Sequence, residues 1–117
     1  MVRPIDREDV KKRIDAGSAV VLEALPPSYY EEGHLPGALN MPLDDIDTLA
    51  PGLLPDKQTE VIVYCSDGPC ANSGIAAKRL EELGYTNVAE YALGKKDWIE
   101  GGLPTVSTSI TTQPTVA

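Results

Sequence analysis

Basic residues are scarce in this chain, and no long apolar run occurs. Lys and Arg together number 10 against 18 Asp and Glu, which leaves a formal net charge of −8. A chain with this charge repels phosphate, so we expect it to bind neither nucleic acid nor an anionic membrane surface. No stretch reaches the ~20 apolar residues that a membrane span requires. Residues 1–9 contain no apolar segment typical of a secretory signal. We therefore expect a cytoplasmic protein with no membrane partner.

Cysteine and histidine are also rare. The chain contains two cysteines, Cys65 and Cys70, and one histidine, His34. These are too few soft ligands for a closed zinc site unless carboxylates or a second chain contribute, so we predict no metal and no cofactor. A disulfide framework is equally disfavoured, because one short loop would constrain very little of the chain. Two neighbouring cysteines in a protein expected in the cytoplasm favour thiol chemistry.

The composition that remains is typical of one soluble domain. The 117 residues suffice for a single hydrophobic core, and 42% of them are apolar while 24% are charged. Beyond residue 104, Thr, Ser, Pro and small residues dominate without periodicity. We therefore predict a domain over residues 1–104 and a disordered C-terminal tail over residues 105–117.

Short apolar runs alternate with helical segments. The clearest strand covers residues 61–64, which are β-branched and aromatic. Asp6 can cap a first helix that Gly17 ends. Further strands are predicted over residues 19–22, 38–41 and 88–91, and further helices over residues 28–32, 43–49, 73–83 and 97–100, with a loop over 51–57. This alternation is typical of an α/β fold with a parallel sheet and helices on both faces.

The loop after the clearest strand has the residues for thiol chemistry. Cys65 directly follows that strand, at the carboxyl end where open parallel sheets bind ligands. The small, turn-forming residues 66–72 can direct several backbone N–H groups toward one point, and the positive end of the next helix adds to them. Such a site stabilises an anion, so it should lower the pKa of a cysteine thiol at its centre. Ser73 is predicted to cap the helix.

Four segments of the chain, in order, resemble the rhodanese (sulfurtransferase) family. Residues 33–42 read Gly-His-Leu-Pro-Gly-Ala-Leu-Asn-Met-Pro, close to the family signature G-H-I-P-G-A-x-N-x-P. Residues 63–68 resemble the strand end and the start of the active-site loop, and residues 75–85 resemble the helix behind it. Residues 93–104 resemble the closing G-G-x-x-x-W-x-x-x-G-L-P segment. The resemblance covers nearly the whole predicted domain.

This resemblance implies a central five-stranded parallel sheet flanked by helices on both faces, and a catalytic cysteine, Cys65, that carries a sulfane sulfur as a persulfide. A small sulfur-containing anion such as thiosulfate, or another persulfide, would donate the sulfur. Cyanide, a thiol or a partner protein would accept it in a second step. The predicted substrate-binding residues are those of the loop and helix start, namely Ser66, Asp67, Gly68, Pro69, Cys70, Ala71, Asn72 and Ser73.

The loop departs from the family pattern C-x-x-G-x-R, which the helix serine directly follows. Cys70 stands where the arginine is usual, two further residues lengthen the loop before Ser73, and Asp67 adds a negative charge. A second habitual arginine, in the family's D-V-R segment, is replaced by Leu25. Without a bidentate cation, dianionic thiosulfate should be a poor substrate, and phosphatase chemistry is disfavoured.

Other functions remain open from the sequence. Cys70 could be a resolving thiol that attacks a Cys65 persulfide or sulfenate and leaves a disulfide, as in a thiol-dependent reductase or redox sensor. That disulfide requires the loop to bring the two Cα atoms within ~7 Å. Alternatively, Cys70 has only a packing role in the wall of the loop. A further alternative is a non-catalytic binding module that keeps the fold, with Cys65 as a buried packing residue, which the missing arginines permit. For His34, a structural hydrogen bond is favoured over a role as general base.

Overall fold

The structure, a computed structural model, describes residues 2–107 as alternating strands and helices. None of the helices within that range is long and apolar enough to cross a membrane. In chain order the elements are β1 (Arg3–Pro4), α1 (Arg7–Ala16), β2 (Val20–Glu23), α2 (Pro27–Glu32), β3 (Leu39–Asn40), the 3-10 helix η1 (Leu43–Asp45), α3 (Ile46–Leu53), β4 (Val61–Tyr64), α4 (Asn72–Glu82), β5 (Val88–Tyr91) and α5 (Gly94–Glu100).

The strands form one five-stranded sheet in the order β1-β5-β4-β2-β3, and every pairing is parallel. This confirms the predicted α/β fold. β4 is the central strand, between β2 and β5, and its position explains why residues 61–64 are apolar without interruption. The edge strand β1 contains only Arg3 and Pro4 and has no apolar run, so the residue pattern did not predict it; its pairing with β5 defines it.

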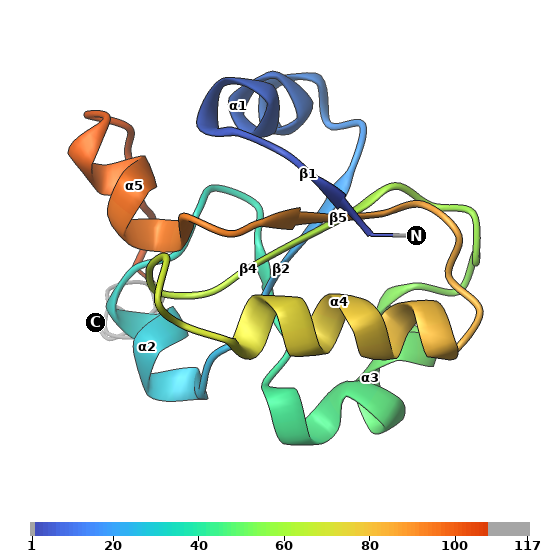
Figure 1. The fold of residues 1–117 in the computed structure, drawn as a ribbon. Coiled ribbons are helices and arrows are strands. Elements are labelled where there is room, and N and C mark those ends of the chain that lie inside the picture. Colours follow the sequence, from blue (N-terminus) through green and yellow to red (C-terminus); the bar gives the residue numbers. More distant parts are fainter. Residues whose placement is uncertain (1, 108–117) are drawn as a thin grey trace, which may run out of the picture.

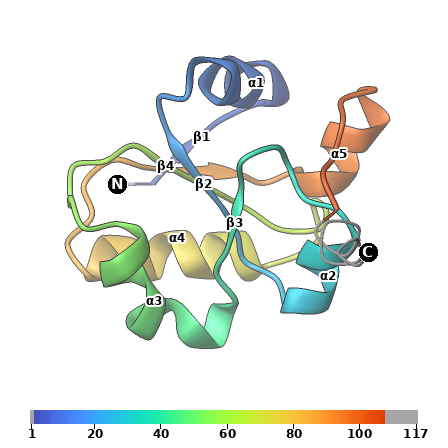
Figure 2. The ribbon, with the colours of Figure 1, turned by 180° about the vertical axis from the view of Figure 1, so that it is seen from behind.

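Helices cover both faces of the sheet (Figures 1 and 2). α1 and α5 lie on one face, and α3 and α4 lie on the other. The side chains of β4 alternate between the two resulting cores: Val61 and Val63 pack on the α3 and α4 side, and Ile62 and Tyr64 pack on the α1 and α5 side. Trp98 of α5 belongs to the second core, with Leu103 packed against it. Since all four β4 side chains are buried, the strand holds the Cys65 loop on a rigid base.

The ends of α1 follow the sequence prediction, whereas the start of α4 does not. The Asp6 carboxylate accepts a hydrogen bond from the N–H of Asp9 at 2.9 Å, and Gly17 ends α1 in the left-handed conformation with φ 65°. In the described chain, α4 follows Ala71 and has no side-chain cap. The prediction that Ser73 caps α4 is wrong, because its buried hydroxyl donates instead to Glu90, at 2.8 Å.

α3 continues through Pro51, where the sequence predicted a loop. Proline lacks the N–H that a helix interior requires, which favours a break there. Packing outweighs this preference, since Ala50 and Leu54 on either side are buried. The Tyr85 hydroxyl also lies 3.2 Å from the Ala50 carbonyl oxygen and 2.7 Å from that of Leu54. Contacts from a distant segment therefore extend the helix beyond its local sequence signal.

The chain after α5 returns to the domain. His34 and Val106 form an antiparallel bridge in which each N–H donates to the other residue's carbonyl, at 2.9 and 2.8 Å. The Ser107 hydroxyl donates to the Glu31 carbonyl at 2.8 Å. The first residues of the predicted tail, 105–107, are thus held against the domain by these contacts. Residues 108–117 lie outside the described residues, so their disorder stays a prediction.

The start of α5 is docked on the loop that follows β4. The N–H of Lys95 donates to the Cys65 carbonyl at 2.9 Å, and that of Lys96 donates to the Ser66 carbonyl at 2.8 Å. These bonds satisfy N–H groups that a helix start otherwise leaves free. They also explain why α5 begins at Gly94 and not at residue 97, as the sequence predicted. Gly94 has φ 68°, and a Cβ there would lie 2.5 Å from the Cys65 carbonyl oxygen, so only glycine fits.

We expect Gly94→Ala to destabilise the protein much more than Gly17→Ala. Both glycines are left-handed, with φ 68° and 65°, so alanine at either costs about 1–2 kcal/mol. A Cβ at Gly17 meets no atom within 4 Å, whereas one at Gly94 collides with the Cys65 backbone. Relieving that collision should cost a further ~1–3 kcal/mol. Denaturant unfolding of the two variants measures the difference, and equal losses of unfolding free energy would contradict the docking contact.

Candidate active site

Cys65 lies at the carboxyl edge of the sheet. It follows Tyr64, the last residue of β4, whose register partners are Glu23 at the end of β2 and Tyr91 at the end of β5. From Cys65 the backbone runs through a loop over residues 65–71 into α4 (Figure 1). The cysteine and the helix start therefore meet where open parallel sheets bind ligands.

Cys65 and Cys70 form a disulfide across this loop. Their Cα atoms are 6.5 Å apart, which is within the ~7 Å that a disulfide between them requires. Cys65 is fully buried, whereas Cys70 is partly exposed. In this state the sulfur of Cys65 is blocked, and Cys70 is the half of the pair that solvent reaches.

The polar groups in contact with the Cys65 sulfur carry oxygen atoms. Sγ lies 3.6 Å from the carbonyl oxygen of Cys70, 3.8 Å from the hydroxyl oxygen of Ser73 and 3.9 Å from the carbonyl oxygen of Asp67. A reduced thiol can donate its proton to one of these oxygens, whereas a disulfide sulfur has no proton to donate. The predicted convergence of N–H groups on this sulfur stays a prediction for the reduced loop.

Asp67 shapes the loop. Its carbonyl oxygen and its Oδ1 both accept from the N–H of Cys70, each at 3.2 Å. An Asp side chain that bonds a following backbone N–H in this way is a common turn former. The turn keeps the backbone of Cys70 close to Cys65. Asp67 therefore has a structural role in addition to the negative charge that it brings to the loop.

Ser73 connects Cys65 to a carboxylate. Its buried hydroxyl lies 3.8 Å from the Cys65 sulfur and donates to Oε2 of Glu90 on β5 at 2.8 Å. A hydroxyl has a single proton, so while Ser73 donates to Glu90 it offers Cys65 only lone pairs. This arrangement supports a thiolate less than a hydroxyl that is free to donate would.

A second carboxylate, that of Glu23, is fully buried beside the loop. Its Oε1 accepts from the Tyr64 hydroxyl at 2.5 Å, and its Oε2 is 3.1 Å from Nζ of Lys95. The Tyr64 hydroxyl in turn accepts from the N–H of Leu35 at 3.1 Å. Burial, and next the negative charge of Glu23, raise the pKa of Tyr64 above its ordinary value, so this hydroxyl stays a donor. The network ties β2, β4 and α5 together next to Cys65.

Sequence reasoning missed Lys95 and Lys96 as residues of this site. Both hold the loop through their backbone N–H groups, and the side chain of Lys95 also pairs with Glu23. The only signal in the sequence is two adjacent lysines directly after Gly94 in an acidic chain. Nothing local to that signal places the lysines against a loop that lies far earlier in the chain.

The remaining predicted loop residues differ in exposure. Ser66, Asp67 and Asn72 are partly buried, whereas Gly68, Pro69 and Ala71 are exposed. The Asn72 side chain donates to the carbonyl of Ala24 at 2.9 Å, so it fastens the start of α4 to the chain after β2. Asn72 therefore has a positioning role in this structure.

A pocket of about 280 Å³ adjoins the exposed part of the loop. Its lining residues are Asp67, Gly68, Pro69, Leu93, Lys96, Asp97 and Glu100. The three carboxylates outnumber the single lysine of the lining, although Asp97 is also paired with Arg7, at 3.1 Å. Such a lining is unfavourable for a dianion, in agreement with the absence of an arginine from the loop.

His34 has structural contacts. Its Nδ1 is 2.9 Å from the Tyr30 carbonyl oxygen, and its ring stacks on that of Tyr30 with centroids 3.8 Å apart. Only 4% of the residue is exposed. The Tyr30 hydroxyl donates to the Ala38 carbonyl at 2.5 Å. The structural hydrogen bond favoured for His34 is therefore confirmed.

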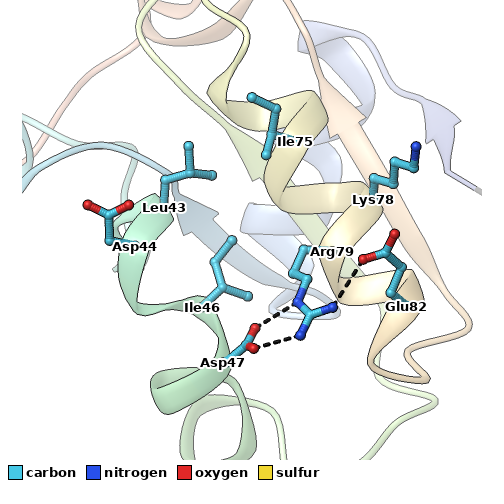
Figure 3. A pocket seen from close by; sticks show the side chains of 8 residues that line it. All are labelled: Leu43, Asp44, Ile46, Asp47, Ile75, Lys78, Arg79 and Glu82. Atoms are coloured by element: carbon cyan, nitrogen blue, oxygen red, sulfur yellow. Dashed lines mark hydrogen bonds and ion pairs between the residues drawn. The ribbon is translucent and has the colours of Figure 1, made fainter.

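Another pocket, of about 610 Å³, lies between η1 with α3 on one side and α4 on the other (Figure 3). Its Arg79 binds Asp47 through two hydrogen bonds, at 2.8 and 2.6 Å, and binds Glu82 at 3.1 Å. The Arg79 hydrogen bonds hold the pKa of the Asp47 carboxyl below its ordinary value. Because Asp47 and Glu82 already balance the charge of Arg79, this arginine is poorly available to a sulfur anion.

We expect Glu90→Gln to make reduced Cys65 more reactive. The change removes a negative charge near the sulfur and loosens the hold on the Ser73 proton, which can then turn toward a thiolate. In a Cys70→Ser background, so that only Cys65 reacts, the initial rate of iodoacetamide alkylation at fixed pH should rise by up to about tenfold. The matched control is Glu32→Gln, which removes the same charge from the exposed side of α2. An unchanged rate, or the same rise in the control, would exclude this role of Glu90.

Comparison with known proteins identifies relatives of this chain. The sequence profile of the rhodanese-like domain family matches residues 6–100. The thiosulfate sulfurtransferase PspE of Escherichia coli is 42% identical over 71 residues, which are 61% of this chain and 65% of that protein. The chain spans 43 to 65% of the length of the curated relatives it matches.

Solved structures share the fold. The solution structure of a rhodanese-like domain from Anabaena is 27% identical with a TM-score of 0.81, and the match covers 100% of this chain and 88% of that one. A rhodanese from Escherichia coli, solved with anions, is 36% identical with a TM-score of 0.65, over 76% of this chain and 98% of that one. The parallel sheet, the cysteine at its carboxyl edge and the profile match together establish that the chain belongs to the rhodanese-like domain family.

Proposed function

We propose that this chain is a sulfurtransferase in which Cys65 carries the transferred sulfur as a persulfide. The observation that carries the proposal is the place of Cys65, held between the end of β4 and the start of α4 at the carboxyl edge of the sheet. Membership of the rhodanese-like family and the similarity to a thiosulfate sulfurtransferase support it.

The proposed reaction has two steps. The Cys65 thiolate attacks the outer sulfur of the donor; a bond forms between Sγ and that sulfur, the donor's S–S bond breaks, and the leaving group departs with the electron pair. An acceptor thiolate then attacks the outer sulfur of the persulfide and takes it, and Cys65 leaves as a thiolate. The charge on the persulfide needs hydrogen-bond donors nearby. We propose that N–H groups of the loop, and the Ser73 hydroxyl once it leaves Glu90, turn toward this sulfur after the disulfide is reduced.

Charges around the loop favour a weakly charged donor. Asp97 of the adjoining pocket is paired with Arg7, which leaves Asp67 and Glu100 beside Lys96. The loop itself has no arginine. Thiosulfate, a dianion that leaves as sulfite, meets an unfavourable field there. We therefore propose a persulfide of a small thiol as the better donor, and a thiol, free or on a partner protein, as the acceptor.

Reduction must precede the reaction, because the disulfide occupies the sulfur of Cys65. A reducing compartment would keep both cysteines as thiols. This requirement agrees with the cytoplasmic location expected from the sequence, and we propose that location for the working enzyme.

The test is a mass measurement on the reduced protein. In the reduced Cys70→Ser variant, freed of reductant, exposure to cysteamine persulfide, whose ammonium offsets the charge of the persulfide, should add about 32 Da, one sulfur atom, to the peptide that contains Cys65. The chain that carries Cys65→Ser in addition to Cys70→Ser should not acquire the adduct. Thiosulfate should give the same adduct at least about tenfold more slowly, since a poorly balanced dianion binds weakly. A Cys65 peptide that never gains sulfur from either donor would refute the proposal.

A further inference from the structure

We propose that Cys70 is a resolving thiol that converts the Cys65 persulfide into free hydrosulfide. The domain would then be a dithiol-dependent reductase of sulfane sulfur as well as a transferase. This inference rests on the proposed function, because it takes the Cys65 persulfide as its starting point.

The geometry for this step is already present in the loop. The two sulfur atoms are bonded, so the Cys70 side chain reaches Sγ of Cys65 without a change of fold. The Cα atoms are 6.5 Å apart, and Asp67 holds the N–H of Cys70 through two acceptors. A nucleophile fixed at this place acts at a high effective concentration, which favours it over thiols in solution.

The step balances in atoms and electrons. The Cys70 thiolate attacks Sγ of Cys65, which is the inner sulfur of the persulfide. A bond forms between the two cysteine sulfurs, the bond to the outer sulfur breaks, and the outer sulfur leaves with the electron pair as hydrosulfide. The two cysteines lose two electrons together, and the sulfane sulfur gains them. The product is the disulfide of this structure.

The difference in exposure between the two cysteines determines which of them a reductant attacks first when the disulfide is reduced. An external dithiol must reduce the disulfide before another sulfur can be accepted. Cys65 is fully buried and Cys70 is partly exposed, so the dithiol meets Cys70 first. Its attack on Cys70 forms a mixed disulfide there and releases Cys65 as the thiolate. A second thiol of the same dithiol then frees Cys70, and Cys65 is ready for the next donor.

The role of Cys70 predicts a single-turnover result. Reduced protein, freed of reductant, is mixed with glutathione persulfide, and sulfide and protein mass are followed. The unsubstituted chain should release about one sulfide per chain and end about 2 Da lighter than the reduced protein, with both thiols lost. Cys70→Ser and Cys70→Ala should keep the sulfur adduct on Cys65 and release sulfide at least about tenfold more slowly. Unfolding curves of both variants verify that they are folded.

The outcomes separate this inference from the proposed function. If the folded Cys70 variants release sulfide as fast as the unsubstituted chain, or if the latter keeps the adduct beside a free Cys70, the resolving role is wrong while the persulfide survives. If neither Cys70 variant gains sulfur on Cys65, the proposed function itself fails. Oxidised protein treated with limiting glutathione and then cleaved before Asp67 should carry the mixed disulfide on the fragment with Cys70. A mixed disulfide on the fragment with Cys65 would overturn the stated order of reduction.

Discussion

Two backbone hydrogen bonds, from the N–H groups of Lys95 and Lys96 to the carbonyls of Cys65 and Ser66, hold the candidate site in place. They join the start of α5 to a loop that lies more than twenty residues earlier in the sequence. Both bonds depend on Gly94, because its missing side chain lets the helix approach the Cys65 backbone. A loop of small and turn-forming residues has little packing of its own. The conformation of this loop is therefore set by contacts with other segments, above all with the start of α5.

Carboxylates define the chemistry around Cys65. Glu23 is buried beside the loop and is balanced by Lys95 and Tyr64. Glu90 accepts a hydrogen bond from the Ser73 hydroxyl, and Asp67 closes the turn that keeps Cys70 near Cys65. The sulfur of Cys65 is bonded to Cys70 and lies near oxygen atoms of Cys70, Ser73 and Asp67, and the loop has no arginine. An environment of this kind suits the exchange of sulfur between thiols better than the binding of a dianion.

The pairing of Cys65 with Cys70 links these electrostatics to redox state. One sulfur is buried and the other is partly exposed, so the pair is asymmetric toward any thiol in solution. In the disulfide the nucleophile is blocked, and in the dithiol it is available beside a second thiol. Any reaction in which Cys65 serves as a thiol therefore depends on the supply of a reductant.

Features that depend on contacts between neighbouring residues could be predicted from the sequence. Asp6 begins α1 and Gly17 ends it, through hydrogen bonds to residues within one turn. Residues 61–64 form a strand buried on both faces, as their uninterrupted apolar character predicts. The place of Cys65 after that strand follows from the same run. Four other features could not be predicted in this way. Ser73 donates to Glu90 and does not cap α4, and Arg3 and Pro4 form a strand. α3 continues through Pro51, and the backbone N–H groups of the lysines after Gly94 hold the loop. Each of these depends on a partner distant in the chain, and such contacts arise only when packing brings separate segments together.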